Sequence, residues 1–310
     1  MVNERGERDE TLKIRRVLVA MDASPHSRAA LEAAIELASH FEAELRGLFV
    51  EDINMLRAVG LPFSRVLGQF SASWRPIDAR EIERRLRTRA RQIQRLFREL
   101  TERSTLSTSF HVARGTVARE ILAAAQEADV LVLGRVGWSQ TREWRLGSTA
   151  RVACTEAAPT MTLVIRQGQP LTTPVLVPYD GAPIGGLALR LGGMLVRGLH
   201  GPLQVLLLPT KEQDVQALRE QVLARLASLR VKPQMRALRE VTPARLVGAI
   251  QEAGCRSLIL PMPLAGVTTQ AAISLVEALD LPVLIVRQVK PADPTSAAVV
   301  SETEGGYHAP

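Results

Sequence analysis

The sequence has little cysteine and no long apolar run, and each shortage excludes a class of protein. Two cysteines, Cys154 and Cys255, are too few for a disulfide framework, and no Cys/His spacing indicates a zinc site. No apolar stretch reaches the roughly 20 residues that a membrane helix needs, because Arg190 and Arg197 interrupt the best candidate. The first residues lack the apolar segment of a secretory signal. We therefore expect a cytoplasmic protein with no membrane segment and no metal site.

Lysine is also scarce, so the net charge of +7 comes almost entirely from arginine. A basic chain can bind nucleic acid, but an arginine bias of this kind is more typical of codon composition. The helix expected over 79–103 mixes arginine with acidic residues, which favours a solvated amphipathic face. We expect no nucleic-acid partner. Binding through that helix stays an alternative, and its affinity would fall steeply with salt.

The chain is built from two similar halves. The stretch RVLVAMDASPHSRAALEAAIELA begins at Arg16, and PVLVPYDGAPIGGLALRLGGMLV begins at Pro174. Each indicates a buried strand, an aspartate (Asp22 or Asp180), a turn of small residues and an apolar helix. The Val/Ile/Leu runs of both halves are continuous rather than alternating, which is typical of strands buried on both faces of a parallel sheet.

We therefore predict an α/β fold of two tandem, doubly wound domains with parallel sheets. The first covers 14–166 and the second 174–287; 167–173 links them, and 288–310 has the composition of a disordered tail. In the first domain we expect strands at 16–21, 44–50, 107–112, 129–133 and 160–165, and helices at 27–40 and 79–103. The apolar segment 50–78 is too long for a simple connection, which indicates a lid over a site or a flap on the second half.

A glycine-rich loop, VLGRVGWSQTREWRLGSTA (132–150), follows the expected fourth strand. Ligands of doubly wound sheets bind outside the carboxyl ends of the strands, so this loop and Asp22 would line one crevice. Gly134 and Gly137 permit positive φ and close approach of the backbone to a ligand. Gly147 and Ser148 would open the next helix, whose unpaired N–H groups and positive dipole end attract an anion such as phosphate.

The spacing Gly134-x2-Gly137-x9-Gly147-Ser148 resembles the nucleotide-binding motif of the universal stress protein family, G-x2-G-x9-G-[S/T]. VLVAMDASPHS also resembles that family's first strand with its aspartate. The resemblance covers both halves, so the chain is similar to a tandem universal stress protein. It implies a five-stranded Rossmann-like sheet of order 3-2-1-4-5 in each half. It also implies ATP, with or without Mg²⁺, between the first and fourth strands.

Carried over by position, the resemblance assigns a set of residues to the adenine nucleotide. Met21 and Asp22 would lie beside the adenosine, and Val50 would border the adenine. The ribose and phosphates would be held by Gly134, Arg135, Gly137, Gly147, Ser148 and Thr149. The implied function is that of an ATP-binding regulatory or sensor module in the stress response.

Domains of this family usually pair through their last strands, which here are 162–165 and 283–286. The two strands could pair inside one chain and cover each other's edges. The alternative is that each strand only fills its own sheet. Either arrangement leaves room for a homodimer of the whole chain.

The second half departs from the motif. Pro261-Met262-Pro263-Leu264 stands where Gly134 would recur, and no Gly-[Ser/Thr] follows at the right distance. Proline also removes a backbone donor. We therefore expect a second domain that folds but does not bind nucleotide.

No group of residues indicates a catalytic site. Asp22, Ser24 and His26 lie too close together on one loop for a nucleophile triad. No Walker lysine follows the glycines. We expect no catalytic residue and slow ATP hydrolysis at most. Two other classes stay open: a nucleotide-free scaffold or chaperone-like stress protein, and an enzyme that adenylates or hydrolyses a small substrate or slowly hydrolyses ATP.

Overall fold

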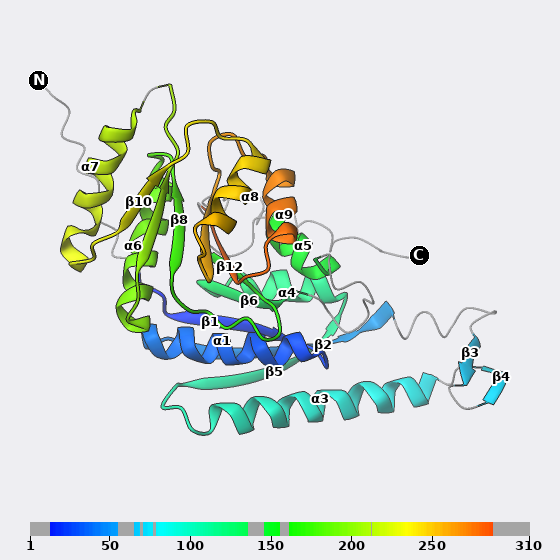
Figure 1. Ribbon diagram of the computed structural model, residues 1–310. Coiled ribbons are helices and arrows are strands. Elements are labelled where there is room, and N and C mark those ends of the chain that lie inside the picture. Colours follow the sequence, from blue (N-terminus) through cyan, green and yellow to red (C-terminus); the bar gives the residue numbers. More distant parts are fainter. Residues whose placement is uncertain are drawn as a thin grey trace, which may run out of the picture.

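The computed structural model describes residues 13–54, 65–68, 71–76, 79–135, 146–155, 161–211 and 213–287. These residues form the expected α/β fold, built on a ten-stranded sheet (Figure 1). The first half contains β1 (Arg16–Met21), α1 (Pro25–Phe41), β2 (Glu44–Asp52), β3 (Arg65–Gly68), β4 (Ser71–Pro76), α3 (Ala79–Thr101), β5 (Thr108–Gly115), α4 (Val117–Ala125), β6 (Val130–Gly134), α5 (Ser148–Thr155) and β7 (Met161–Ile165). The second half contains β8 (Val175–Tyr179), α6 (Pro183–Leu199), β9 (Leu203–Leu207), α7 (Val215–Leu226), η1 (Ala227–Leu229), β10 (Gln234–Ala237), α8 (Pro243–Glu252), β11 (Ser257–Met262), α9 (Thr269–Ala278) and β12 (Val283–Arg287).

The ten strands lie in the order β10-β9-β8-β11-β12-β7-β6-β1-β2-β5. Each half contributes five neighbouring parallel strands, and both halves have the order 3-2-1-4-5 when β3 and β4 are set aside. The halves meet where β12 pairs antiparallel with β7, with Val283 opposite Val164 and Val286 opposite Met161. These are the last strands of the two halves, so each covers an edge that the other would leave exposed.

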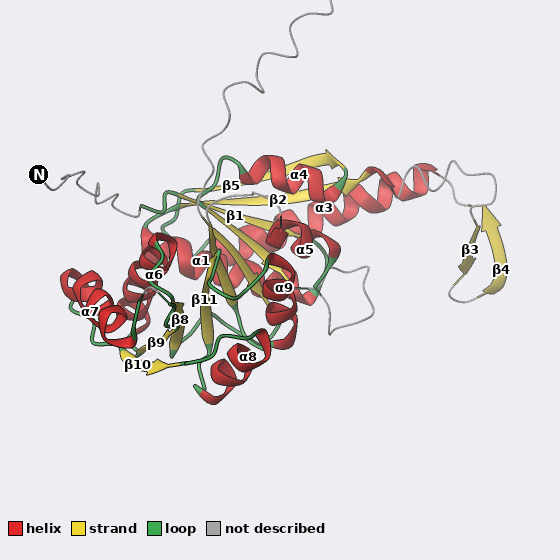
Figure 2. Ribbon diagram, turned by 90° about the horizontal axis from the view of Figure 1, so that it is seen from above, coloured by secondary structure: helices red, strands yellow, loops and turns green. Residues whose placement is uncertain are grey.

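Helices cover both faces of the sheet. Apolar side chains of α1, α3, α6 and α7 form one core, and those of α4, α5, α8 and α9 form the other. Figure 2 shows α6 and α7 on one side of the strands and α5, α8 and α9 on the other. Within β1, Val17 and Val19 point into the first core while Leu18 and Ala20 point into the second. Burial on both faces is the physical reason why the strand sequences are unbroken apolar runs.

The turn after the first strand is built in the same way in both halves. Asp22 Oδ1 accepts the N–H of Ser24 at 2.9 Å, and Asp180 Oδ1 accepts the N–H of Ala182 at 3.0 Å. A proline at the first helical position follows in each case, where its missing N–H is not needed. In the first half the Ser24 side chain also caps α1 by accepting the N–H of Ser27.

The segment expected as a lid or flap contains an antiparallel hairpin of β3 and β4. Figures 1 and 2 both place this hairpin beyond the N-terminal end of α3, away from the ten-stranded sheet. The parts at 55–64, 69–70 and 77–78, like the tail 288–310, lie outside the described residues. Within the ranges that the structure describes, no helix is long and apolar enough to cross a membrane.

Candidate functional site

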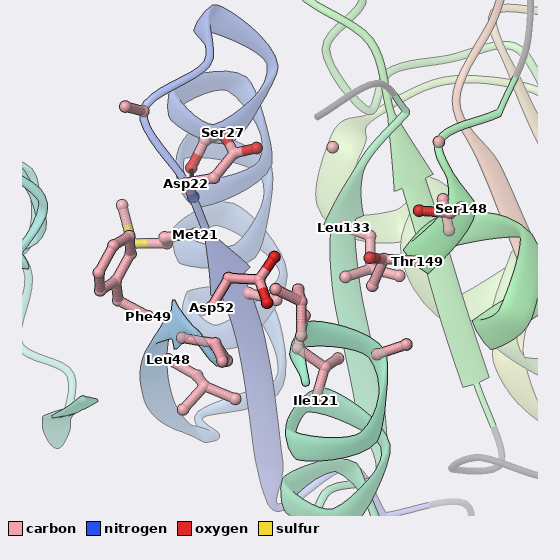
Figure 3. Close-up of a pocket in the computed structure, with 18 of the residues that line it drawn as sticks. Met21, Asp22, Ser27, Leu48, Phe49, Asp52, Ile121, Leu133, Ser148 and Thr149 are labelled. Carbon is pink, nitrogen blue, oxygen red and sulfur yellow. Dashed lines mark hydrogen bonds between the residues drawn. The ribbon is translucent and has the colours of Figure 1, made fainter. Parts of the chain in front are cut away.

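A cavity of about 460 Å³ opens at the carboxyl ends of β1, β2 and β6 (Figure 3). The first turns of α4 and α5 also contribute to its wall. Seven of the residues expected at a nucleotide line it, namely Met21, Asp22, Val50, Gly134, Gly147, Ser148 and Thr149. Segments more than 100 residues apart in the sequence therefore meet around one space, as expected for the crevice of a doubly wound sheet.

Much of the cavity wall is apolar. The apolar side chains include Met21, Leu48, Phe49, Val50, Val117, Ile121 and Leu133. Figure 3 shows Leu48 and Ile121 at one end of the cavity and Leu133 toward α5. A wall of this composition suits a flat, weakly polar group.

Two carboxylates stand at the strand ends. The Asp22 N–H donates to Ser27 Oγ at 2.9 Å, and the Asp22 carboxylate holds the turn described above. Asp52 Oδ1 accepts the N–H of Asn54 at 2.9 Å. Figure 3 places both carboxylates across the cavity from Ser148 and Thr149. Arg89 of α3 adds a positive charge to the wall.

The N-terminus of α5 forms the opposite side of the cavity. The Gly147 carbonyl accepts the N–H of Arg151 at 2.9 Å, so Gly147 is the residue at which helical hydrogen bonding begins. The N–H groups of Ser148 and Thr149 lie in the first turn, where an α-helix offers no acceptor. These amides and the positive end of the helix dipole make this side suitable for an anion.

Gly134 does not use the positive φ expected of it, and it has a packing role that the sequence did not indicate. Its φ is not positive, so the left-handed backbone that a glycine permits is not used here. A Cβ atom at Gly134 would instead lie 3.0 Å from the Cβ of His26 and 3.1 Å from its carbonyl carbon. The glycine lets the first turn of α1 pack directly against the end of β6. Gly137 lies outside the described residues.

Arg135 does not line the cavity, contrary to the expectation that it holds ribose or phosphate. Its Nη1 donates to the Leu279 carbonyl at 2.7 Å and its Nη2 donates to the Glu277 carbonyl at 2.5 Å. Both carbonyls belong to the C-terminal end of α9, whose partial negative charge attracts a cation. Burial lowers the pKa of the Arg135 guanidinium, and the charge of Arg166 lowers it further, against the opposing carboxylates of Asp280 and Glu277.

Two charged groups of the cavity, Asp52 and Arg89, are not predicted by the sequence. We expected the second strand to end at Val50, but β2 continues to Asp52 by pairing with β5. The acidic pair that follows the apolar run of this strand was the available signal for Asp52. Arg89 had no comparable signal, because arginines occur throughout that helix.

The corresponding region of the second half is filled by its own loop. Asp180 Oδ2 accepts the N–H of Ala265 at 2.8 Å, in the loop that follows β11. Met262, Leu264 and Val267 are buried around this loop. The second aspartate therefore binds protein backbone at the place where the first faces the cavity. Among the described residues of either half, no group of three or more His, Cys, Asp or Glu is arranged to hold a metal ion.

Comparisons with known proteins agree with this geometry. Residues 13–166 match the model of the universal stress protein family. A universal stress protein from Archaeoglobus fulgidus is 15% identical, with a TM-score of 0.65 over 88% of this chain and 98% of that chain. A functionally unknown protein from Pseudomonas aeruginosa is also 15% identical, with a TM-score of 0.55 over 88% of this chain and 92% of that chain. No curated protein matches the chain significantly.

The two structural likenesses extend over both halves and show that the whole arrangement is a known fold. The family match is confined to the half that carries the glycine motif and the cavity. Through residues 13–166, the chain belongs to the universal stress protein family.

Proposed function

We propose that the first half binds ATP in the cavity and that the chain acts as a nucleotide-dependent regulatory or sensor module. Membership of the universal stress protein family supports a role in the stress response. The ATP assignment depends on one observation: a single cavity combines an apolar wall, two carboxylates and the N-terminus of α5. These are the three environments that a base, a ribose and a phosphate chain require.

Each part of the nucleotide has a matching region in this proposal. The cavity volume falls within the range of about 300–1,000 Å³ that is usual for ligand sites. The adenine would pack against apolar side chains such as Leu48 and Val50. Asp22 or Asp52 would accept hydrogen bonds from ribose hydroxyls, and the phosphates would face the amides of Ser148 and Thr149.

Magnesium would be bound mainly through the nucleotide. The described residues supply no three-ligand acidic or histidine cluster for it. Mg²⁺ commonly keeps several waters and binds through substrate phosphates with one or two carboxylates. The carboxylates of Asp22 and Asp52, which line the cavity, would be these protein ligands.

The site favours binding over turnover. Both carboxylates accept backbone N–H groups from the turns that follow them. This arrangement suits fixed hydrogen-bond acceptors better than a base that takes a proton from water. We propose that hydrolysis is slow and that the bound state itself is the signal.

Calorimetric titration with ATP, with and without Mg²⁺, tests this function directly. The expected result is one nucleotide per chain, held by the first half. Analysis of small molecules released from the denatured purified protein gives an independent readout of adenine nucleotides. No measurable binding at millimolar ATP would leave a nucleotide-free scaffold, two sites per chain would refute the closed second half, and several turnovers per second would indicate an enzyme.

A further inference from the structure

The second half contacts the glycine motif of the first half through one carboxylate. Glu277, near the C-terminal end of α9, accepts the N–H of Leu146 through Oε1 at 3.2 Å. The same oxygen accepts Nη2 of Arg151, in α5, at 2.5 Å. Leu146 immediately precedes Gly147, and Arg151 follows it by one helical turn. Glu277 therefore contacts residues on both sides of Gly147, Ser148 and Thr149, which line the cavity.

Arg135 provides a second connection to the same helix end. Its guanidinium donates to the α9 carbonyls, and its own carbonyl accepts the N–H of Gly147 at 2.9 Å. Both described ends of the motif segment, Arg135 and Leu146–Gly147, are thus attached to α9. These contacts act from outside the cavity, since no described residue of the second half lines it.

The side chains of Glu277 and Arg135 are largely shielded from solvent, which strengthens their hydrogen bonds. The Glu277 side chain is 21% exposed, and Arg135 is 5% exposed. Hydrogen bonds between ionised groups at such positions are stronger than neutral ones. Another inter-half ion pair, Arg166 to Asp280 at 2.5 Å, involves a carboxylate that is 62% exposed and is bonded to Arg166 instead of the segment 146–151. It offers a matched control.

We infer that Glu277 is a positioning residue, through which the second half holds the first turn of α5 so that the amides of Ser148 and Thr149 are oriented to donate to phosphate. The inference deepens the proposed nucleotide site and depends on it. Holding the segment before the ligand arrives removes an ordering cost from binding. The coupling is reciprocal, so a nucleotide in the first half also stabilises the junction with the second half.

Removal of the Glu277 carboxylate distinguishes two roles of this residue, because loss of positioning weakens ATP binding and loss of its negative charge alone tightens it. Removing the negative charge of Glu277 leaves more net positive charge beside the phosphates, which by itself would tighten the binding of an anion. Loss of positioning instead weakens it. We expect Glu277→Ala to weaken ATP binding about tenfold, Glu277→Gln to weaken it less because the amide oxygen still accepts a hydrogen bond, and Asp280→Asn to leave it unchanged.

Calorimetry on the full chain with ATP and with adenosine tests these expectations. Adenosine carries no phosphate, so its affinity should be the same for the wild type and for Glu277→Ala. A loss of ATP affinity in Glu277→Ala without a loss for adenosine supports the inference. Unchanged or tighter ATP binding, or an equal loss for both ligands, overturns it.

Hydrogen exchange on the ligand-free protein separates this inference from the proposed function. Amides at 146–151 should exchange faster in Glu277→Ala than in the wild type or in Asp280→Asn. If the wild type bound no ATP, the proposed function would fail, while faster exchange would still show that Glu277 holds the segment. Unchanged exchange at these amides would refute the positioning role, whatever the protein binds.

Discussion

The two halves share a fold and an opening turn but differ at the carboxyl ends of their strands. Asp22 and Asp180 both hold the N–H two residues ahead of them. In the first half the space beyond the aspartate is a cavity, and in the second half the loop after β11 donates the Ala265 N–H into it. The loop after β11 therefore closes the crevice of the second half at the position where the described residues of the first half leave a cavity.

The comparison also shows what a closed half can contribute. Its last helix ends against the motif segment of the open half, where Arg135 and Glu277 make the connection. A half whose crevice is filled by its own loop can thus support the cavity of its neighbour from outside. The two halves share one topology, but the first contains the cavity and the second supports it.

The largest effect is expected at the β7–β12 junction, to which each half contributes its last strand. Val164 and Val283 lie opposite each other and are fully buried. A buried, unpaired carboxylate is severely unfavourable, so we expect Val164→Asp and Val283→Asp each to destabilise the protein by about 4 kcal/mol or more. Urea unfolding measures the change, and the two losses should be similar.

Val112 in β5 supplies the control, because it is 39% exposed. Val112→Asp should change the stability by about 0.5 kcal/mol or less, apart from its lower strand propensity. Unfolding of one half alone in Val164→Asp, seen as two separate transitions, would contradict a sheet that holds both halves together.

The next largest effects are expected for Asp22 and Asp180, whose surroundings differ between the two halves. Asp180→Ala leaves the partly buried N–H groups of Ala182 and Ala265 without their acceptor, so we expect a loss of about 2 kcal/mol in unfolding free energy. The ATP affinity of this variant should not change. Asp22→Ala should instead weaken ATP binding about tenfold, because one acceptor of the nucleotide is lost.

Thermal or urea unfolding and calorimetry on both variants complete this test. The prediction is a crossed pattern, with stability lost mainly in one variant and affinity mainly in the other. If Asp180→Ala weakened ATP binding as much as Asp22→Ala, the second half would not be closed to nucleotide.

The smallest expected effect concerns the two cysteines, one in each half. Burial raises the pKa of both Cys154 and Cys255 to about 11. Both thiols are therefore protonated at neutral pH, and alkylation by iodoacetamide should be slow and should accelerate as the pH approaches 11. Because Cys154 is more deeply buried, Cys255 should react first. Mass spectrometry of the labelled peptides follows both rates.

The same raised pKa values predict a small loss of stability in alkaline solution. An unfolded cysteine ionises at about 8.5, well before the folded thiols do. Stability from the neutral thiols is complete below that pH and is lost as the pH rises toward 11. Cys154→Ser should reduce this alkaline loss. Fast alkylation of Cys154 at neutral pH would show that its helix opens readily.

Much of the fold could be predicted because its strands are buried on both faces. Such strands appear in the sequence as continuous apolar runs, and Arg16–Met21 and Met161–Ile165 lie within one residue of the expected limits. The end of β2 was predicted two residues early, because backbone pairing with Arg114 and Gly115 continues after the apolar pattern has stopped. Apolar patterns report burial, whereas strand ends depend on hydrogen bonding.

The candidate site was predictable in its backbone and less so in its side chains. Gly134, Gly147 and Ser148 could be placed because strand ends and helix starts fix where the chain runs. The direction of Arg135 could not be predicted, because one of its carbonyl partners lies 144 residues further along the chain. An arginine beside a glycine motif is equally consistent with a phosphate ligand and with an interface residue. Only the tertiary structure distinguishes the two.

The antiparallel junction between β7 and β12 gives the molecule a polarity. Because the strand direction reverses there, the carboxyl ends of the two parallel sets face opposite poles of the sheet. One pole carries the crevice and the other carries its sealed counterpart. The same reversal brings the chain entering β12, and with it the end of α9, to the open pole. A partner that senses occupancy of the crevice would therefore approach from this single pole, where it would meet surfaces from both halves at once.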